Sequence, residues 1–484
     1  MSFSMATAPG PDAALANVRF DGRVSRDDDD IDAAASDFGG IYRHRPLAVL
    51  SPASVDDIVR AVGWARTWGV TVAARGRGHS TAGQSQAAGG LVVDMASLSA
   101  IRAVGDDWME VEAGATWKEV LDEALSRGLM PPVVPDYLGL SVGGTIALGG
   151  LGYQTCRYGT IVDNVAELLV VTGTGKIVVC SARVNPDLFV AARGGLGHFG
   201  IVGAVRLRMI PAPARIRLDR LLYTDLALLL EDLERLGRSP EPYDTIAAFA
   251  IPNEPEALRT VLRDAADGLW FAPWMFRRLF ILQIGRYVPA NAVSEPLSEL
   301  QATGCVPDVV HRWTEPFASF ADRAMEHHTA WKASGLWDAA HPWLDVILPG
   351  DVAEQWLAET LDALDPADPA DGPVMMYPMM AGRSRGSFLQ LPASDYCVRV
   401  DVLRSVLPES PRTALQLIES NRERYARAVA GGAVHYPSGA LDLTDDEWRA
   451  HFSRVWDAFR RARAAYDPAR MFSPCTCGGG LTEE

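Results

Sequence analysis

Cysteine is scarce in this sequence, and its spacing argues against two kinds of fold. Six cysteines occur among 484 residues, and the closest two, Cys475 and Cys477, have a single residue between them. Disulfide-stapled folds need a denser set of cysteines, and zinc sites need wider spacing within each pair. We therefore expect six free thiols and no metal site.

Long apolar runs and clusters of positive charge are lacking as well. No stretch reaches the about 18 consecutive apolar residues that a membrane span needs, and the N-terminus has no basic segment followed by an apolar core. The 45 lysines and arginines face 61 acidic residues, and the resulting net charge of −16 opposes binding to nucleic acid. No internal repeat is visible. These features predict a cytoplasmic protein with no membrane or nucleic-acid partner.

The hydrophobic content of 48% is enough for two or three domains with packed cores. Up to about residue 213, short apolar runs alternate with amphipathic segments, which indicates an α+β domain. Thr116 and Glu119 have the spacing of a capping box, and Gly128 ends that helix. Ser54 is the predicted N-cap of an earlier helix, with Asp57 three residues on. We expect strands at 46–50, 70–76, 89–95, 108–114 and 199–210, a hairpin at 164–180, and helices at 54–69, 116–128 and 185–195.

The segment PAPAR, at 211–215, marks a domain boundary. The part that follows mixes helical and strand-like runs, which predicts a largely antiparallel sheet covered by helices. We expect a helix at 226–237, strands at 245–252, 279–285, 343–348 and 395–403, and one long helix at 445–466. The predicted fold class is therefore α+β with two domains, one made of residues 1–213 and 441–484 and the other of residues 214–440.

Two glycine motifs have the letters of nucleotide-binding signatures in the wrong context. Gly195, Gly197 and Gly200 have the spacing of a dinucleotide fingerprint, but a predicted helix precedes them and a strand follows. The fingerprint requires the opposite order, so that the pyrophosphate meets a helix N-terminus. The run TGTGK at 172–176 lacks P-loop spacing and fits a hairpin turn. We therefore exclude a Rossmann NAD site and a P-loop.

Two other glycine-rich segments suit a large ligand. The loop at 76–84 follows a predicted strand and has arginines beside its glycines, while 140–152 adds the hydroxyls of Ser141 and Thr145. Backbone amides in such loops can converge on a phosphate, because missing side chains permit close approach. Tight turns between strands would have the same composition. The residues alone leave both interpretations open.

Six segments in order resolve this choice through a resemblance. They are ARGRGHSTAGQ, PDYLGLSVGGTIALGG, NPDLFVAARGGLGHFGIVGAVRLRMIPAP, HPWLDVILP, GPVMMYPMM and YDPARMFSP. In this order the sequence resembles the cytokinin dehydrogenases, FAD-dependent oxidoreductases of the vanillyl-alcohol oxidase type. The match extends from about Asp37 to Ser473 and spans both predicted domains.

The resemblance implies roles for particular residues. His79 matches the histidine that bonds covalently to FAD in the family, although FAD held without a covalent bond is an alternative. Asp136 matches the catalytic aspartate, which accepts a proton from the substrate amine while hydride leaves the adjacent carbon for flavin N5; by its residues alone, Pro135-Asp136-Tyr137 also fits an ordinary turn. The other FAD contacts implied are Gly76, Arg77, Gly78, Ser80, Gln84, Asp136, Ser141, Ala147, Ile201, Val202, Tyr436 and Ser473, and Thr145 is a further candidate.

The substrate side departs from the family pattern. Trp343 matches a tryptophan that stacks on the substrate ring. Asp345 stands where the family has asparagine, and Ala247, in YDTIAA, stands where it has glutamate, unless Asp244 substitutes for that acid. We therefore expect a small flat aromatic or allylic amine or alcohol as substrate, with oxygen or a quinone as electron acceptor. Three hypotheses remain: a dehydrogenase of cytokinin-like amines, a flavin enzyme of bacterial secondary metabolism, and a non-catalytic flavin-binding protein.

Overall fold

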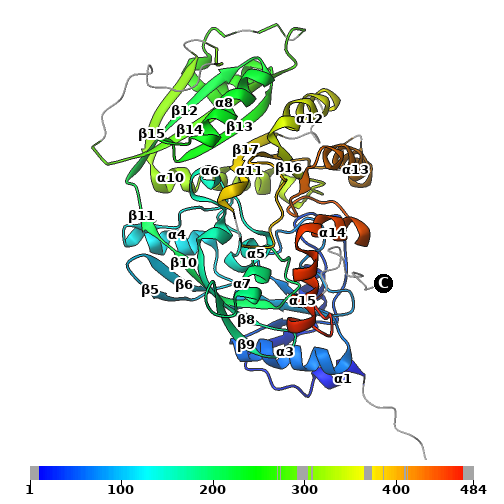
Figure 1. Cartoon of the computed structure of the whole chain (residues 1–484). Helices are drawn as coiled ribbons and strands as arrows, with labels where there is room; N and C mark the ends of the chain where they lie inside the picture. The colour runs from blue at the N-terminus through cyan, green and yellow to red at the C-terminus, as the bar shows by residue number, and fades with distance from the viewer. Residues whose placement is uncertain are drawn as a thin grey trace, which may run out of the picture.

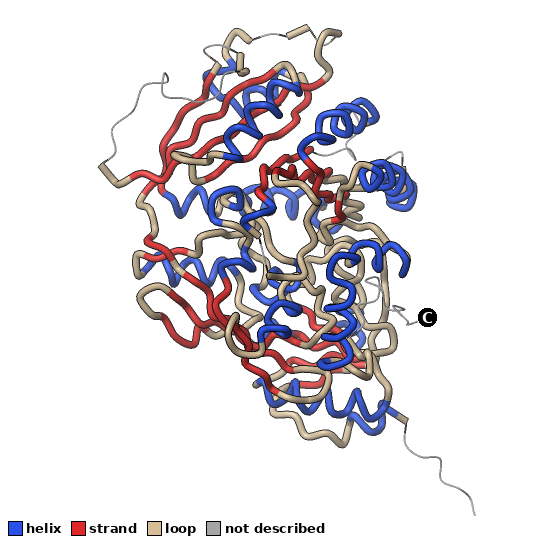
Figure 2. Tube along the Cα trace, in the orientation of Figure 1, coloured by secondary structure: helices blue, strands red, loops and turns tan. Residues whose placement is uncertain are grey.

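The computed structural model describes residues 10–472 except 270, 273, 292–303, 307–308, 365–372, 385, 408–409 and 411. The chain forms two layered α/β regions, which lie one above the other in Figure 1. The N-terminal region holds a four-stranded sheet, a five-stranded sheet and a two-stranded pair, and the region above it is built on one large sheet (Figures 1 and 2). The predicted α+β fold is confirmed.

The first sheet of the N-terminal region has four strands in the order β1-β2-β4-β3. The β2–β4 and β3–β4 pairs are parallel, so the predicted strands need crossover connections, and α3 (Val55–Trp68) supplies one of them. The strands are β1 (Arg23–Ser25), β2 (Ala48–Ser51), β3 (Val72–Arg75) and β4 (Leu91–Asp94). Buried residues of α3, β2 and β4 form a common core. This sheet positions the glycine-rich loop that follows β3.

The second sheet of this region has five antiparallel strands in the order β5-β6-β10-β8-β9. The predicted hairpin at 164–180 is β8 and β9, and the glycines of 195–200 stand between a helix and β10, in the order that excludes a Rossmann site. The elements are β5 (Ile101–Val104), β6 (Trp108–Glu112), β8 (Val165–Val171), β9 (Ile177–Ser181), β10 (Ile201–Arg208), a short pair β7 (Leu129–Met130) and β11 (Ile210–Pro211), and the helices α1 (Pro11–Leu15), α2 (Asp28–Ala34), α4 (Trp117–Ser126), α5 (Val142–Leu148), α6 (Thr155–Tyr158) and α7 (Pro186–Ala192).

Two predicted helix starts have different outcomes. The capping box of Thr116 and Glu119 is present, with each side chain bonded to the other residue's backbone. Ser54 precedes α3, but its side chain makes no capping bond. Asp57 instead accepts hydrogen bonds from the backbone N–H groups of Asp21, Gly22 and Ala53, so it ties the N-terminal segment to the helix.

The large sheet contains eight strands, all of them paired antiparallel, in the order β15-β12-β14-β13-β17-β18-β16-β19. The strands are β12 (Arg215–Tyr223), β13 (Thr245–Pro252), β14 (Arg278–Val288), β15 (Val310–Pro316), β16 (Leu344–Pro349), β17 (Val374–Met380), β18 (Tyr396–Val402) and β19 (Val434–His435). The helices around it are α8 (Leu226–Arg238), α9 (Pro255–Leu262), α10 (Phe317–Ala321), α11 (Ala324–Ser334), α12 (Gly350–Ala363) and α13 (Ala414–Ala430).

The two faces of this sheet have different neighbours. Leu221, Leu282, Ala248 and Met376 are cross-strand neighbours that belong to the core under α8. Because side chains alternate along a strand, the residues next to these face the other way, where α6 and α10 also contact the sheet. That second face is turned toward the N-terminal region, and it holds the residues that complete the site described below.

The C-terminal segment returns to the first part of the chain, where its helices, red in Figure 1, lie beside blue and cyan elements. Arg463 donates to the backbone O of His198, and Val72 N–H donates to the Met471 O. The single helix predicted at 445–466 is wrong. It is two helices, α14 (Asp445–His451) and α15 (Trp456–Tyr466), because the chain turns at Ser453–Val455 so that Trp448, Phe452 and Phe459 all reach the core. The domain boundaries stay predictions.

Within the described residues, no helix has the length and apolarity to cross a membrane, and no group of acidic, histidine or cysteine side chains has metal-binding geometry. Cys156, Cys180, Cys305 and Cys397 are free thiols, as expected. The other two cysteines lie outside the described residues.

Candidate active site

The loop after β3 is packed against the second glycine-rich segment. Gly76 lies directly under Ser141, and a Cβ at position 76 would come within 1.9 Å of the Ser141 Oγ. Gly78 has φ +65°, and a Cβ there would meet the Arg75 guanidinium at 2.3 Å. The two glycine-rich segments that sequence reasoning singled out therefore pack against each other, with Ser141 and Arg75 filling the space that side chains at 76 and 78 would need.

His79 lies at the centre of a group of aromatic rings. The Phe38 ring stacks on it with 3.9 Å between centroids, and the rings of Tyr137, Trp337 and Trp343 lie at 5.1, 5.7 and 6.2 Å. Its Nε2 is buried and has no hydrogen-bond partner among the described residues. Burial lowers the pKa of His79 to about 3, so the imidazole is neutral at physiological pH. A neutral, unpartnered ring nitrogen is what nucleophilic attachment of a cofactor needs.

Asp37 holds the His79 loop in place, a role that sequence reasoning missed. Its Oδ2 accepts hydrogen bonds from the Ser80 hydroxyl at 2.9 Å and from the Gly83 N–H at 2.7 Å. The next residue, Phe38, donates its N–H to the Gly78 O at 2.8 Å. Burial raises the pKa of Asp37 to about 6, opposed by these hydrogen bonds and by Arg75. A carboxyl group 42 positions before His79 thus fixes the conformation of the loop.

Asp136 lies between the two regions of the protein. The Arg323 guanidinium forms an ion pair with its Oδ1, and the Tyr377 hydroxyl donates to its Oδ2 at 2.7 Å. Burial, and next the charge of Asp136, raise the pKa of Tyr377 well above its usual value, so the hydroxyl stays protonated and remains a donor. The side chain of Asp136 is 29% exposed, so its carboxylate can be reached from outside the protein. It is not the ordinary turn residue that its immediate neighbours suggest.

Arg323 completes this arrangement from the corner between α10 and α11. Its guanidinium carbon lies 4.0 Å from the Tyr153 ring centroid and 4.5 Å from that of Phe320. Cation–π contacts of this kind hold an arginine in one orientation. No sequence signal distinguished Arg323 from the other arginines, because its partners come from distant segments.

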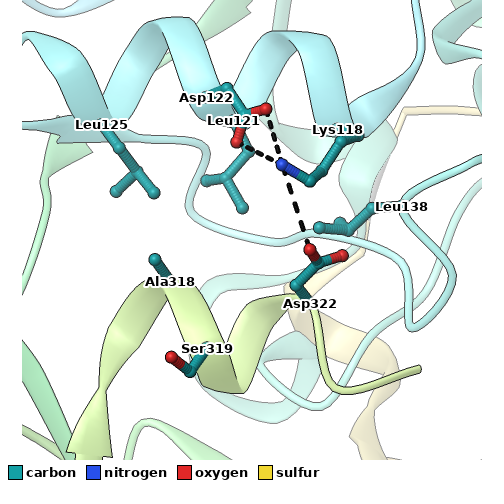
Figure 3. A pocket seen from close by; sticks show the side chains of 8 residues that line it. All are labelled: Lys118, Leu121, Asp122, Leu125, Leu138, Ala318, Ser319 and Asp322. Atoms are coloured by element: carbon teal, nitrogen blue, oxygen red, sulfur yellow. Dashed lines mark hydrogen bonds and ion pairs between the residues drawn. The ribbon is translucent and has the colours of Figure 1, made fainter. Parts of the chain in front are cut away.

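A surface pocket shows how that corner is attached to the N-terminal region. In Figure 3, Lys118 of α4 points between Asp122 of the same helix and Asp322, which precedes Arg323. The Lys118 Nζ lies 2.6 Å from Asp122 and 3.9 Å from Asp322. None of the predicted site residues lines this pocket. We therefore interpret its ion pairs as contacts that hold the α10–α11 corner against α4, and not as a ligand site.

A row of side chains crosses the large sheet on the face turned toward Asp136. In cross-strand order it contains Arg220, Gln283, Ala247 and, on the neighbouring strand, Tyr377. Arg220 donates to the Gln283 Oε1 at 2.8 Å. Ala247, which is 1% exposed, is therefore the one apolar member of a polar row.

The alternative acid, Asp244, is engaged elsewhere. It accepts hydrogen bonds from the Tyr158 hydroxyl at 2.8 Å and from the Tyr287 N–H at 2.7 Å, and it pairs with Arg157 at 3.3 Å. Both of its oxygens are used in these contacts. Asp244 is therefore engaged in contacts within the chain itself.

Trp343 and Asp345 lie at the start of β16, next to the His79 loop. The Asp345 Oδ2 accepts from the Ser438 hydroxyl, and Ser438 O accepts from the Thr81 hydroxyl at 2.6 Å. The Tyr436 N–H donates to the Asp345 backbone O at 3.0 Å. The Trp343 Nε1 and the Asp345 Oδ1 are buried without a partner among the described residues. Loop and sheet are thus linked by direct hydrogen bonds.

The remaining predicted contacts are dispersed around this centre. The Gln84 amide bonds to the Pro437 O and to the Ala82 N–H, whereas Arg77 points outward and lies 3.9 Å from Glu119. The Thr145 hydroxyl accepts from the Trp117 Nε1 and donates to the Ser141 O. Ala147 lies in α5, and Ile201 and Val202 begin β10. Ser473 lies outside the described residues.

The residues present fit FAD. The unpartnered atoms of His79, Trp343 and Asp345 come from two separate segments that meet, next to the closely packed glycine loop of 76–78. A buried polar atom without a partner needs an explanation, and a bound ligand is one. His79 would hold the flavin, and the loop with Ser141 would lie against its polar parts.

Comparisons with known proteins decide the family. Residues 46–181 match a model described as an FAD binding domain, and residues 213–477 match one described as "Cytokinin dehydrogenase 1, FAD and cytokinin binding". The second match alone covers more than half of the chain. The chain belongs to the cytokinin dehydrogenase family.

Individual relatives agree with this assignment. The chain is 33% identical to cytokinin dehydrogenase 9 of Oryza sativa subsp. japonica, over 96% of its own length and 91% of that protein. It is 30% identical to cytokinin dehydrogenase 1 of Arabidopsis thaliana, over 96% and 83%. A bacterial relative, an uncharacterized oxidoreductase of the fasciation locus of Rhodococcoides fascians, is 32% identical over 93% and 97%. The resemblance inferred from six segments is confirmed, and the chain is an FAD-dependent oxidoreductase of the cytokinin dehydrogenase type.

Proposed function

We propose that this protein oxidises a secondary allylic amine by removing hydride from the carbon next to nitrogen, with FAD attached covalently to His79. The observation that supports this most directly is the Asp136 carboxylate, held by Arg323 and Tyr377 one residue before a tyrosine whose ring lies 5.1 Å from that of His79. A proton acceptor thus lies beside the proposed attachment point of the flavin.

The chemistry divides between the cofactor and the chain. The flavin supplies the acceptor for the hydride. Asp136 accepts the proton of the substrate nitrogen as the C–H bond breaks, and Arg323 and Tyr377 keep its carboxylate in one orientation. The product is an imine, which water hydrolyses to an aldehyde and a free amine. The rings of Phe38, Trp337 and Trp343 surround His79, whose Nε2 is buried.

The substrate we propose is flat and aromatic at the end that contacts Trp343, as an adenine-type cytokinin is. The relatives named cytokinin dehydrogenase support this class. Ala247 indicates a different substrate preference within this class. With alanine at this position, the protein offers no acidic side chain to the amine end of a cytokinin, where the family resemblance implies a glutamate. We therefore expect weak turnover of isopentenyladenine. The electron acceptor, oxygen or a quinone, and the cytoplasmic location stay predictions.

A second candidate is a flavin oxidoreductase acting on an alcohol or amine of secondary metabolism. The apolar side chain of Ala247 within an otherwise polar row favours it, because the pocket then offers less to a polar amine. The third hypothesis, a non-catalytic flavin protein, does not explain why Arg323 and Tyr377 both bond to Asp136.

The test is anaerobic reduction of the flavin. Purified protein is mixed with isopentenyladenine, with other adenine-type cytokinins or with unrelated aromatic alcohols, and the oxidised-flavin absorbance is followed. We expect bleaching by allylic amines with a flat ring. Bleaching by alcohols alone would favour the second candidate, and a bound flavin that no compound in the panel reduces would contradict an enzymatic role on these substrates.

A further inference from the structure

A pair of buried carboxyl groups lies in the large sheet beside the proposed flavin site. Asp345 on β16 and Asp401 on β18 are direct cross-strand partners, 1% and 3% exposed. Directly opposed side chains lie on the same face of the sheet, with Cβ atoms about 4.5–5.5 Å apart. Two buried carboxyl groups this close repel each other when both are ionised, and burial and this charge repulsion raise the pKa of Asp401 well above its usual value. We therefore infer that the pair retains one proton in the folded protein.

One cation faces these two acids at close range. The Arg399 Nε donates to the Asp401 Oδ1 at 2.7 Å, and its guanidinium also lies over the rings of Tyr377 and Tyr436. The described titratable and charged groups that face the pair are Arg399 on β18, Tyr377 on β17, His435 and Tyr436 at β19, and Asp136. A single positive charge is therefore shared among several acidic groups.

The pair is connected to the flavin loop through one residue. Ser438 donates its hydroxyl to Asp345 and accepts, at its backbone O, the hydroxyl of Thr81, two positions after His79. The Asp345 Oδ1 is buried without a partner among the described residues. Trp343, two positions before Asp345, lies 6.2 Å from His79 between ring centroids. Asp345 thus has a free acceptor oxygen next to the residues that would surround the flavin.

The pair can take up a second proton near neutral pH. Burial raises the pKa of Asp345 to about 6, opposed by Arg399 and by the Ser438 hydroxyl. Burial also raises the pKa of Asp401 well above its usual value, with Arg399 opposing and the charge of Asp345 adding. A new negative charge nearby raises both further. At pH 7 the pair is therefore poised to take up a proton when such a charge arrives.

We propose that Asp345 and Asp401 form a proton store that takes up one proton from solvent when the flavin at His79 is reduced. Hydride transfer brings two electrons and one proton to the flavin and leaves it with one more negative charge. A second proton converts the Asp345 carboxylate to the acid and offsets that charge, while the proton of the substrate nitrogen goes to Asp136. Reoxidation by the electron acceptor releases the stored proton. The proposal rests on the flavin site proposed above.

The test is the pH dependence of the flavin midpoint potential, measured on full-length, flavin-loaded protein between pH 5 and 8.5. A tenfold change in proton concentration shifts a two-electron potential by about 30 mV for each proton taken up. We expect Asp345→Asn to lose about 30 mV per pH unit of slope above pH 6, and to have a higher potential than wild type at pH 8 because a negative charge is gone.

Asp401→Asn separates proton storage from a structural role. It replaces the carboxyl group that keeps its proton by a neutral amide and leaves Asp345 buried, so the steeper slope above pH 6 should be retained. Asp395→Asn, at an exposed position just before β18, is the matched control and should behave as wild type. Equal slopes in wild type and in Asp345→Asn would overturn the proposal. If neither Asp345→Asn nor Asp401→Asn retains flavin, the test rests on the wild-type protein. A wild-type midpoint potential whose pH dependence does not steepen above pH 6 would overturn the proposal. Failure of the wild type to bind flavin would refute the proposed function instead.

Discussion

Replacement of Asp136 by asparagine tests the proposed chemistry most directly. Asparagine keeps the shape of the side chain and one acceptor oxygen, but it cannot accept a proton. Arg323 and Tyr377 both bond to the carboxylate, so the substitution also weakens two interactions on the substrate side, while the contacts of the His79 loop are untouched. We therefore expect Asp136→Asn to bind flavin normally and to reduce it slowly.

The expected loss in the rate of flavin reduction follows from the loss of the general base. General-base catalysis contributes about 10² to 10⁴ in rate, which at about 1.36 kcal/mol per tenfold corresponds to about 3 to 5 kcal/mol of activation free energy. Tyr377→Phe removes one hydrogen bond to an ionised group, about 1.5–3 kcal/mol, and should slow reduction by about tenfold to hundredfold. The order of the two variants is therefore predicted as well as their direction.

The assay is anaerobic stopped-flow absorbance of the oxidised flavin after mixing with the best substrate of the panel. Asp106→Asn is the matched control, because Asp106 is an exposed carboxylate in the turn between β5 and β6, outside the site. Reduction of the Asp136→Asn flavin at the wild-type rate would refute the role of Asp136 as base. Loss of flavin from that variant would show a structural role instead.

Three further outcomes are expected. Flavin absorbance should stay with the polypeptide after acid precipitation, and His79→Ala should lose FAD or hold it reversibly; flavin found wholly in the wild-type supernatant would rule out the covalent bond. Ala247→Glu should increase kcat/KM for isopentenyladenine by about tenfold to hundredfold, the value of one charged hydrogen bond, in a steady-state comparison with wild type; efficient turnover by the wild type itself would defeat this reasoning. Burial raises the pKa of Asp37 to about 6 from 3.8, so the stability it contributes is present below about pH 4 and lost as pH rises through 6. Calorimetry should therefore show Asp37→Asn gaining in Tm relative to wild type between pH 5 and pH 8, by about 1.4 kcal/mol in unfolding free energy, and an equal difference at both pH values would contradict this.

The sequence by itself determined most of the local elements and the family to which the chain belongs. The alternation of apolar residues identified the strands that become β2, β3, β4, β6, β8, β9, β13, β14, β16 and β18, because period-two patterning depends only on neighbours in the chain. The capping box at Thr116 was identifiable for the same reason. The helix break at Ser453–Val455 was not, since it arises from the packing of aromatic side chains against a distant core.

Tertiary structure alone decided which side chains surround the reacting atoms. Arg323 and Tyr377 reach Asp136 from 187 and 241 positions away. Asp345 meets Asp401 only through the register of β16 against β18, and Asp37 meets Ser80 across a loop. Strand order and register are set by the burial of whole faces, which no local spacing records. His79 and Asp136 could therefore be proposed as site residues from the sequence, but the arginine, tyrosine and carboxyl groups that lie around them could not.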